Sequence, residues 1–261
     1  MGDFLKVFRW TYKNDFVEPF PELVLLLGVV SVSSSYSLGF DATNEFAKLT
    51  WDLTLLTLIF AAIGGVMSYS LALERGQVTE QLLSLRVSRA RFVALKWASV
   101  FVILAVFALL FDFVAFFLYL GYFPNLGAYT TWGEAPGFAF LIMVGEQLVF
   151  LAFLNSLVMA VSFGLRRTTI SLLAFLAFTL FSAGYFPLGS AAIPDFLRLG
   201  YGDYLFVNGL SYYAYLLFAS SPQALVSAPT TTDYLVLAYR AVGAVVLFII
   251  SVGLFVRADL D

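Results

Sequence analysis

The chain has 261 residues, of which 61% are hydrophobic and 12% are charged, whereas a soluble domain carries about 25% charged residues. This composition indicates a protein that resides in lipid, and the net charge of −3 argues against nucleic-acid binding. Cysteine and histidine are absent, which excludes disulfides, zinc or haem bound through these side chains, and Ser-His or Cys-His catalytic pairs.

Residues 1–19 have the pattern of a helix that lies on a membrane surface. One side carries residues at helical spacing: Leu5, Phe8, Arg9, Tyr12 and Phe16. Lys6 and Lys13 fall on another side, which makes the segment amphipathic. We expect an amphipathic interfacial helix on the cytoplasmic face of the bilayer, the alternative being a solvated tail.

Six runs of the sequence are apolar and long enough to cross the hydrocarbon core, which takes roughly 20 residues as a helix. They cover residues 23–40, 53–73, 97–120, 138–165, 168–188 and 234–256. The expected fold is therefore an all-α polytopic membrane protein, with a single transmembrane domain over residues 1–261 and a place in the plasma membrane.

The basic residues predict the orientation of these spans. With both termini in the cytoplasm, most basic residues fall on the inner side, as the positive-inside rule requires. The inner residues are Lys6, Arg9, Lys13, Arg75, Arg86, Arg89, Arg91, Lys96, Arg166, Arg167 and Arg257. Only Lys48, Arg198 and Arg240 remain on the outer side, so we predict cytoplasmic N- and C-termini.

Residues 189–232, before the last span, are expected to form an extracellular or re-entrant helical segment. The stretch 204–221 is almost long enough for a seventh span, which would place the C-terminus outside. However, Asn208, Gly209 and Pro222 interrupt or end it, and its tyrosines suit an interface better than a hydrocarbon core. We predict six spans, with seven as the alternative.

Between the second and third spans, residues 74–96 form a charged island that we expect in the cytoplasm. Thr79 and Ser88 each stand where a helix cap is needed, and Val87 and Phe92 are placed for a hydrophobic staple around the second cap. The pattern predicts a short helix after Thr79, a break, and a second helix from Ser88 that continues into the third span. A structured elbow of this kind is a docking surface.

This elbow carries an ordered set of residues: Glu74, Arg75, Gly76, Thr79, Glu80, Leu82, Leu83, Leu85, Val87, Ser88 and Arg89, followed by Lys96. Together with the six spans, the amphipathic N-terminal helix and the large outer segment, this set resembles the permease subunit of type-2 ABC (ATP-binding-cassette) exporters. The set departs from the family pattern in three ways. Thr79 and Glu80 are adjacent and lie further from Gly76 than usual, Arg86 stands where the pattern has proline, and Leu95 replaces a small residue before Lys96.

In that family the elbow includes a coupling helix that docks into a groove on a separate ATPase subunit. The resemblance implies a permease that forms the substrate path and works as a dimer with a second copy or a paralogue. Leu82, Leu83 and Leu85 would be the apolar plug, and the arginines around it would pair with acids on the partner. The alternative is a retention loop with self-packed leucines.

The chain has no Gly-x-x-x-x-Gly-Lys-[Ser/Thr] phosphate loop. We therefore expect no enzyme activity and no cofactor on this chain, and the resemblance implies that ATP and Mg bind to the partner ATPase. The surrounding membrane lipids are the remaining expected partner.

Asp112, Glu146 and Arg240 are the ionisable residues expected at membrane depth, all in the outer half. An unpaired charge there costs about 2.5–3.5 kcal/mol, so we expect the three to neutralise one another or to line a polar path. The second reading fits an ion- or proton-coupled carrier, which is an alternative function, as is a non-transporting scaffold subunit. Gly64 and Gly65 in the second span would let helices approach closely.

Overall fold

The computed structural model describes residues 2–17, 64–71, 73, 87–122, 136–174 and 231–257. Within these ranges the backbone is helical except at 87–88, 166–167 and a final turn at 257, and no strand occurs among them. The main elements are α1 (Gly2–Thr11), η1 (Tyr12–Val17), η2 (Met67–Leu71), α6 (Arg89–Tyr122), α7 (Pro136–Leu165) and α12 (Thr231–Val256). The all-α prediction is confirmed for this part of the chain.

Three of these helices are long and apolar enough to cross a membrane. The candidate spans are Arg89–Leu110 with 22 residues, Leu148–Leu165 with 18 and Leu237–Val256 with 20. They coincide with the predicted third, fourth and last spans, so the protein is a membrane-embedded helical protein. The first predicted span, most of the second and fifth, and the outer segment lie outside the described residues: 23–40, 53–63, 175–188 and 189–230.

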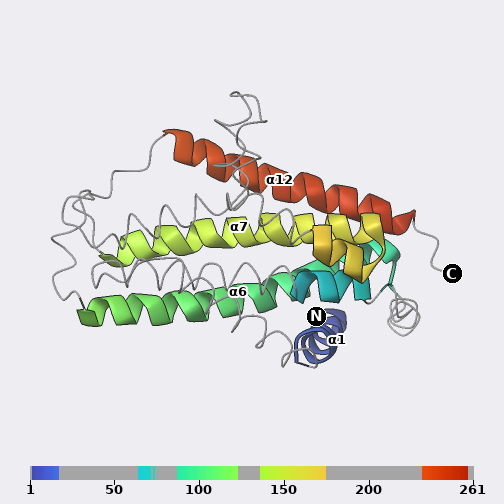
Figure 1. The fold of residues 1–261 in the computed structure, drawn as a ribbon, viewed down its shortest axis with the longest axis horizontal. Coiled ribbons are helices and arrows are strands. Elements are labelled where there is room, and N and C mark those ends of the chain that lie inside the picture. The colour runs from blue at the N-terminus through green and yellow to red at the C-terminus, as the bar shows by residue number, and fades with distance from the viewer. Residues whose placement is uncertain are drawn as a thin grey trace.

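The three long helices do not all run in the same direction. α6 begins at the end of the bundle where α7 and α12 both end, so α7 and α12 run in the same direction and α6 runs against them (Figure 1). A hydrogen bond of 3.2 Å from Arg89 Nη1 to the Val256 carbonyl joins the start of α6 to the end of α12. We refer to this end of the bundle as the α1 end.

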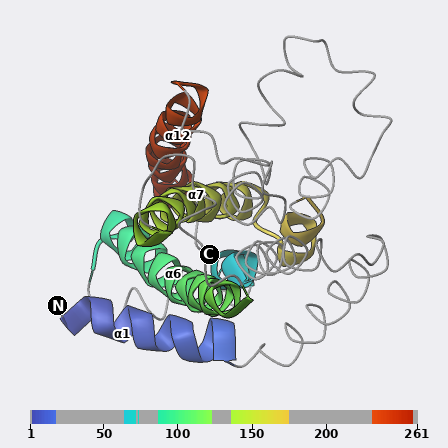
Figure 2. The same cartoon turned by 90° about the vertical axis from the view of Figure 1, so that its left-hand side faces the viewer.

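The N-terminal helix lies across the α1 end. Figure 2 views the three long helices nearly along their length, and α1 passes crosswise beside the start of α6. A helix at right angles to a membrane bundle, at the level where the spans end, has the position of an interfacial helix. This arrangement is consistent with the amphipathic helix predicted for residues 1–19, of which residues 2–17 are described.

The faces of α1 differ in part from the predicted pattern. Leu5 and Tyr12 are 57% and 47% exposed, as a membrane-facing stripe requires, whereas Phe16 is only 2% exposed and belongs to the core. The row that turns towards the protein is instead Val7 and Thr11 of α1 with Asp15 of η1, all buried. Because η1 is a wider π-helix, Asp15 stays in line with the two buried residues that precede it.

The core at the α1 end is built around an aromatic chain. Tyr69 of η2 meets Phe163 of α7 edge to face at 5.7 Å between ring centroids. Phe163 meets Phe255 of α12 at 5.0 Å, and Phe255 meets Phe92 of α6 at 6.1 Å. Each such pair adds about 0.5–1.5 kcal/mol beyond its buried area, so this chain holds four elements together.

Glycines in the second predicted span allow close approach, as the sequence predicts. A Cβ on Gly64 would lie 2.5 Å from Cε1 of Phe16, and one on Gly65 would lie 2.9 Å from Cγ1 of Val158. Contacts this short do not occur between real Cβ atoms and their neighbours. The two glycines therefore allow η1 on one side and α7 on the other to pack directly on this backbone.

Candidate functional site

The predicted coupling elbow is described only at its C-terminal end. Most of its predicted residues lie outside the described ranges: Glu74, Arg75, Gly76, Thr79, Glu80, Leu82, Leu83 and Leu85. Ser88 is exposed and its Oγ accepts a long hydrogen bond of 3.4 Å from the Arg91 N–H, three residues on, as a helix cap does. The predicted cap at the start of α6 is therefore present, and the two residues predicted for the staple belong to one region, since the partly buried Val87 packs against the core cluster that contains Phe92.

The two residues that flank residues 74–86 are both fixed to the bundle. Leu73 on one side and Val87 on the other are partly buried and pack against the same core cluster. That cluster includes Tyr69, Phe92 and Phe163 at the α1 end. Val87 lies directly before the start of α6, and Leu73 lies two residues after the end of η2.

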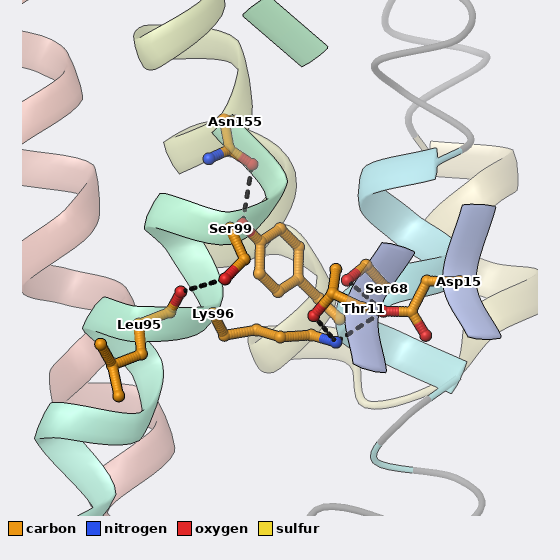
Figure 3. Close-up of polar contacts among 8 residues, drawn as sticks. Thr11, Asp15, Ser68, Leu95, Lys96, Ser99 and Asn155 are labelled. Atoms are coloured by element: carbon orange, nitrogen blue, oxygen red, sulfur yellow. Dashed lines mark hydrogen bonds and ion pairs between the residues drawn. The ribbon is translucent and has the colours of Figure 1, made fainter. Parts of the chain in front are cut away.

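Near the start of α6 lies a buried ion pair that the sequence did not reveal. Lys96 of α6 donates a hydrogen bond of 2.5 Å to Oδ2 of Asp15 in η1, and the two side chains are only 3% and 5% exposed. The same ammonium donates to Thr11 Oγ1 at 3.1 Å and lies 4.6 Å from the ring centre of Trp10. Ser68 of η2 donates to the same carboxylate oxygen at 2.7 Å, so four elements, α1, η1, η2 and α6, meet here (Figure 3).

A buried ion pair is stable only when further polar groups surround it, because taking two charges out of water costs several kcal/mol per ion. Here the Thr11 and Ser68 hydroxyls supply those groups. Removing either charge would leave the other buried without compensation. The pair therefore fixes α1 and η1 in one position on α6 and η2.

The sequence places Lys96 at the end of the charged elbow, where the third span opens. In the structure Lys96 lies inside the candidate span Arg89–Leu110 and pairs with Asp15. Arg91 also has a partner within the chain, because its Nη2 lies 3.0 Å from Oδ2 of Asp3 in α1. Arg89 bonds to the carbonyl of Val256. Arg89, Arg91 and Lys96, in the first turns of α6, thus each contact another segment of the same chain.

A second polar chain runs deeper into the bundle. Tyr69 donates to Asn155 Oδ1 at 2.7 Å, and Asn155 Nδ2 donates to the Trp97 carbonyl at 3.1 Å. Trp97 Nε1 in turn donates to Ser156 Oγ at 2.9 Å. These bonds join η2, α6 and α7 immediately behind Lys96, and Figure 3 shows Asn155 on the far side of the close-up from Asp15.

A third contact connects the helix that follows α7. Ser70 donates to Ser171 Oγ at 3.2 Å, which joins η2 to the helical residues 168–174. Arg166, in the break between α7 and this helix, has φ of 55°, the left-handed conformation that ends many helices. Three successive residues of η2 therefore bond to three different segments: Ser68 to η1, Tyr69 to α7 and Ser70 to the helical residues 168–174.

Of the three predicted intramembrane charges, the structure describes the side chain of Arg240 only. It is 4% exposed, and its guanidinium carbon lies 5.0 Å from the ring centre of Phe150 on α7. Asp112 and Glu146 lie in α6 and α7, but their side chains are outside what the structure describes. Phe150 follows Glu146 by one helical turn, so the two occupy one face of α7. The pairing with Arg240 stays a prediction.

Nothing in the described ranges forms a metal centre, since no three Asp, Glu, His or Cys side chains come together there. The polar groups at the α1 end are instead joined to one another. These contacts fix the positions of the helices relative to one another.

No protein-family model matches the chain, and comparisons with curated proteins and with solved structures also found no match. Fold and site together define the class: a membrane-embedded, all-helical protein whose N-terminal helix is fixed across the end of its bundle by a buried ion pair.

Proposed function

We propose that the chain is the membrane-spanning permease subunit of an ATP-driven ABC exporter, coupled to separate ATPase subunits through residues 74–96. The observation that carries the proposal is the anchorage of this elbow. Leu73 and Val87 both pack on the core at the α1 end, beside Lys96 and its buried partner Asp15. A segment held on both sides by a rigid core transmits a push from a docked subunit to the spans.

In this proposal the elbow acts on two elements at once. Through Val87 it acts on the start of α6, and through Leu73 it acts on η2 and the polar contacts of that element. The ion pair between Lys96 and Asp15 makes α1 move with α6 rather than separately. ATP binding would close the partner ATPases, push on the elbow and bias a permease dimer between conformations that open the substrate path differently.

The direction of α12 supports the six-span topology. If the chain crosses the membrane once between α7 and α12, α12 must start at the end where α6 finishes, and this is its direction in Figure 1. A seven-span chain with two crossings in that stretch would reverse α12. The C-terminus then lies on the α1 end, together with exposed basic residues that favour the cytoplasm: Lys6, Arg9, Lys13, Arg166, Arg167 and Arg257.

The docking claim is tested with the double variant Leu82→Asp/Leu83→Asp in the full chain. Carboxylates in the proposed apolar plug should abolish co-purification with a candidate ATPase and abolish stimulation of its ATP hydrolysis, while membrane insertion is retained. The matched control is Leu82→Met/Leu83→Met, which keeps the plug apolar and should bind normally. Co-purification of the aspartate variant at the level of the control would show that these leucines are not the docking element.

The carrier alternative has its own test. Purified chain in vesicles, with no ATPase added, would move solute under an ion or proton gradient, and Asp112→Asn or Glu146→Gln would stop that movement. A chain that neither transports nor stimulates an ATPase would fit the scaffold alternative.

A further inference from the structure

The N-terminal segment formed by α1 and the start of η1 combines a row of aromatic residues, of which Phe4 and Phe8 are half-buried and Tyr12 is exposed, with a row of exposed cations. Phe4, Phe8 and Tyr12 follow one another at four-residue spacing, with ring centroids 5.9 Å and 6.4 Å apart. The aromatic row flanks the buried residues Val7, Thr11 and Asp15 on one side. Lys6 and Lys13 are exposed on the other side, and Arg9 is also exposed. Helices that lie in a membrane interface typically carry aromatic residues on the face towards the lipid and Lys or Arg on the polar face.

The acids that would cancel this positive charge are already engaged. Asp3 forms an ion pair with Arg91, and Asp15 forms one with Lys96. The other acids of the described ranges lie in the far halves of α6, α7 and α12: Asp112, Glu146 and Asp233. Within the part of the chain that the structure describes, the α1 end is therefore positively charged although the whole chain has a net charge of −3.

We propose that α1 and the start of η1 form a binding surface for anionic lipid headgroups of the leaflet at the α1 end, with Lys6, Arg9 and Lys13 as the residues that contact them. Charge complementarity carries this assignment, because each Lys or Arg near an anionic bilayer surface attracts it by an amount comparable to thermal energy or above. Figure 2 shows α1 lying crosswise to the three long helices, as a helix in a membrane interface does. The buried ion pair then fixes the lipid-binding helix to α6.

This inference goes beyond the proposed function and does not depend on an ATPase. It requires only that the bundle sits in a bilayer. Its test can therefore fail while the coupling proposal stands, and the reverse also holds.

The experiment measures which lipid gathers beside α1. The chain has no native cysteine, and a side chain at Gly2 would meet nothing within 4 Å, so Gly2→Cys accepts a fluorophore without disturbing the fold. The labelled chain is reconstituted in phosphatidylcholine vesicles with a small fraction of spin-labelled lipid, either phosphatidylglycerol or phosphatidylcholine. The ratio of quenching by the two lipids reports the local enrichment of anionic lipid.

We expect the anionic lipid to quench at least about fivefold more strongly, which corresponds to about 1 kcal/mol. Lys6→Gln/Arg9→Gln/Lys13→Gln should lower the ratio to about one, whereas the charge-conserving control Lys6→Arg/Arg9→Lys/Lys13→Arg should keep it. Raising the salt concentration from about 0.05 M to about 0.5 M should also remove the preference in the unsubstituted α1, by screening.

Three results would overturn the proposal. One is equal quenching by the two lipids with the native α1 sequence. A second is a preference that survives in the glutamine variant. The third is specific competition by inorganic phosphate, beyond the effect of chloride at the same ionic strength, which would indicate a site for free phosphate and not a lipid surface.

Discussion

The ammonium of Lys96 lies 2.5 Å from a carboxylate oxygen of Asp15, 81 residues away in sequence, and both side chains are buried. This contact joins the N-terminal segment to the first turns of α6. The proposed coupling elbow joins the same core, through Leu73 and Val87. The ion pair thus connects α6, which follows the elbow, to the N-terminal segment that contains α1. Any movement of α6 at this end therefore carries α1 with it.

Replacing Lys96 by Met should destabilise the protein by about 3–5 kcal/mol, because Asp15 is left as an uncompensated buried charge. The double variant Lys96→Met/Asp15→Leu should recover most of that loss, since two apolar side chains can replace a buried pair. Unfolding in detergent micelles measures both variants. Hydrogen exchange should rise over residues 2–17 in the single variant. A double variant no more stable than the single one would contradict this account of the pair.

The exposed pair at the same interface should behave differently. Arg91→Gln breaks a contact to Asp3 in which the side chains are 62% and 35% exposed, and exposed pairs contribute about 0.2–1 kcal/mol. The stability of this variant should also become less dependent on salt than that of the wild type. A loss as large as that of Lys96→Met would mean that burial does not distinguish the two ion pairs.

Gly64→Val should displace Phe16, because a Cβ at this position lies 2.5 Å from Cε1 of the ring. The expected loss is about 1–3 kcal/mol, as for other overpacked core sites, and Phe16→Ala in the same chain should relieve part of it. Gly253→Ala is the control, since its Cβ would meet nothing within 4 Å. Thermal unfolding of the variants measures each loss of stability. Losses of stability that simply add up when Gly64→Val and Phe16→Ala are combined would argue against a contact between these residues.

Arg240 is expected to neutralise Asp112, Glu146 or both. Arg240→Ala should then destabilise the protein, and adding Asp112→Asn or Glu146→Gln should recover part of the loss as a non-zero coupling. If instead Asp112→Asn or Glu146→Gln alone leaves stability unchanged and alters transport, that carboxylate lines a path. Additive losses in both cycles would show that the three residues do not interact.

Both termini are expected in the cytoplasm. Cysteines introduced singly at Gly2 and Asp261, in a chain without native thiols, should resist a membrane-impermeant thiol reagent in intact cells and react after lysis. Labelling of the C-terminal cysteine alone in intact cells would favour seven spans. The direction of α12 relative to α6 leads us to expect protection at both sites.

Individual elements were predictable where local chemistry is sufficient. The start of α6 is one case, because the Ser88 cap and the residues around it act within a single turn. The three described spans are another, because roughly 20 consecutive apolar residues have few alternatives to a membrane helix. The described part of α1 was predicted as a helix, but its buried face was not, since η1 winds differently from an α-helix.

The ion pair at the α1 end was not predictable from local pattern. A lysine at position 96 beside Arg91 and Arg89 fits a positive-inside loop, and Asp15 fits a solvated helix face. One signal was present: Thr11 and Asp15 are four residues apart, on a different side of the N-terminal helical pattern from Lys6 and Lys13. That spacing indicates a polar helix face that packs against another polar group, but it does not predict that this group is Lys96.

The amino-acid sequence by itself determined the class of this protein, because low charge and long apolar runs leave a helical membrane protein as the stable solution. It also determined where α6 begins. The tertiary structure was needed to show that Lys96 is buried beside Asp15 and that Phe16 packs against Gly64. The physical reason is that burial of a charge depends on groups from distant segments converging in space, which local spacing does not encode.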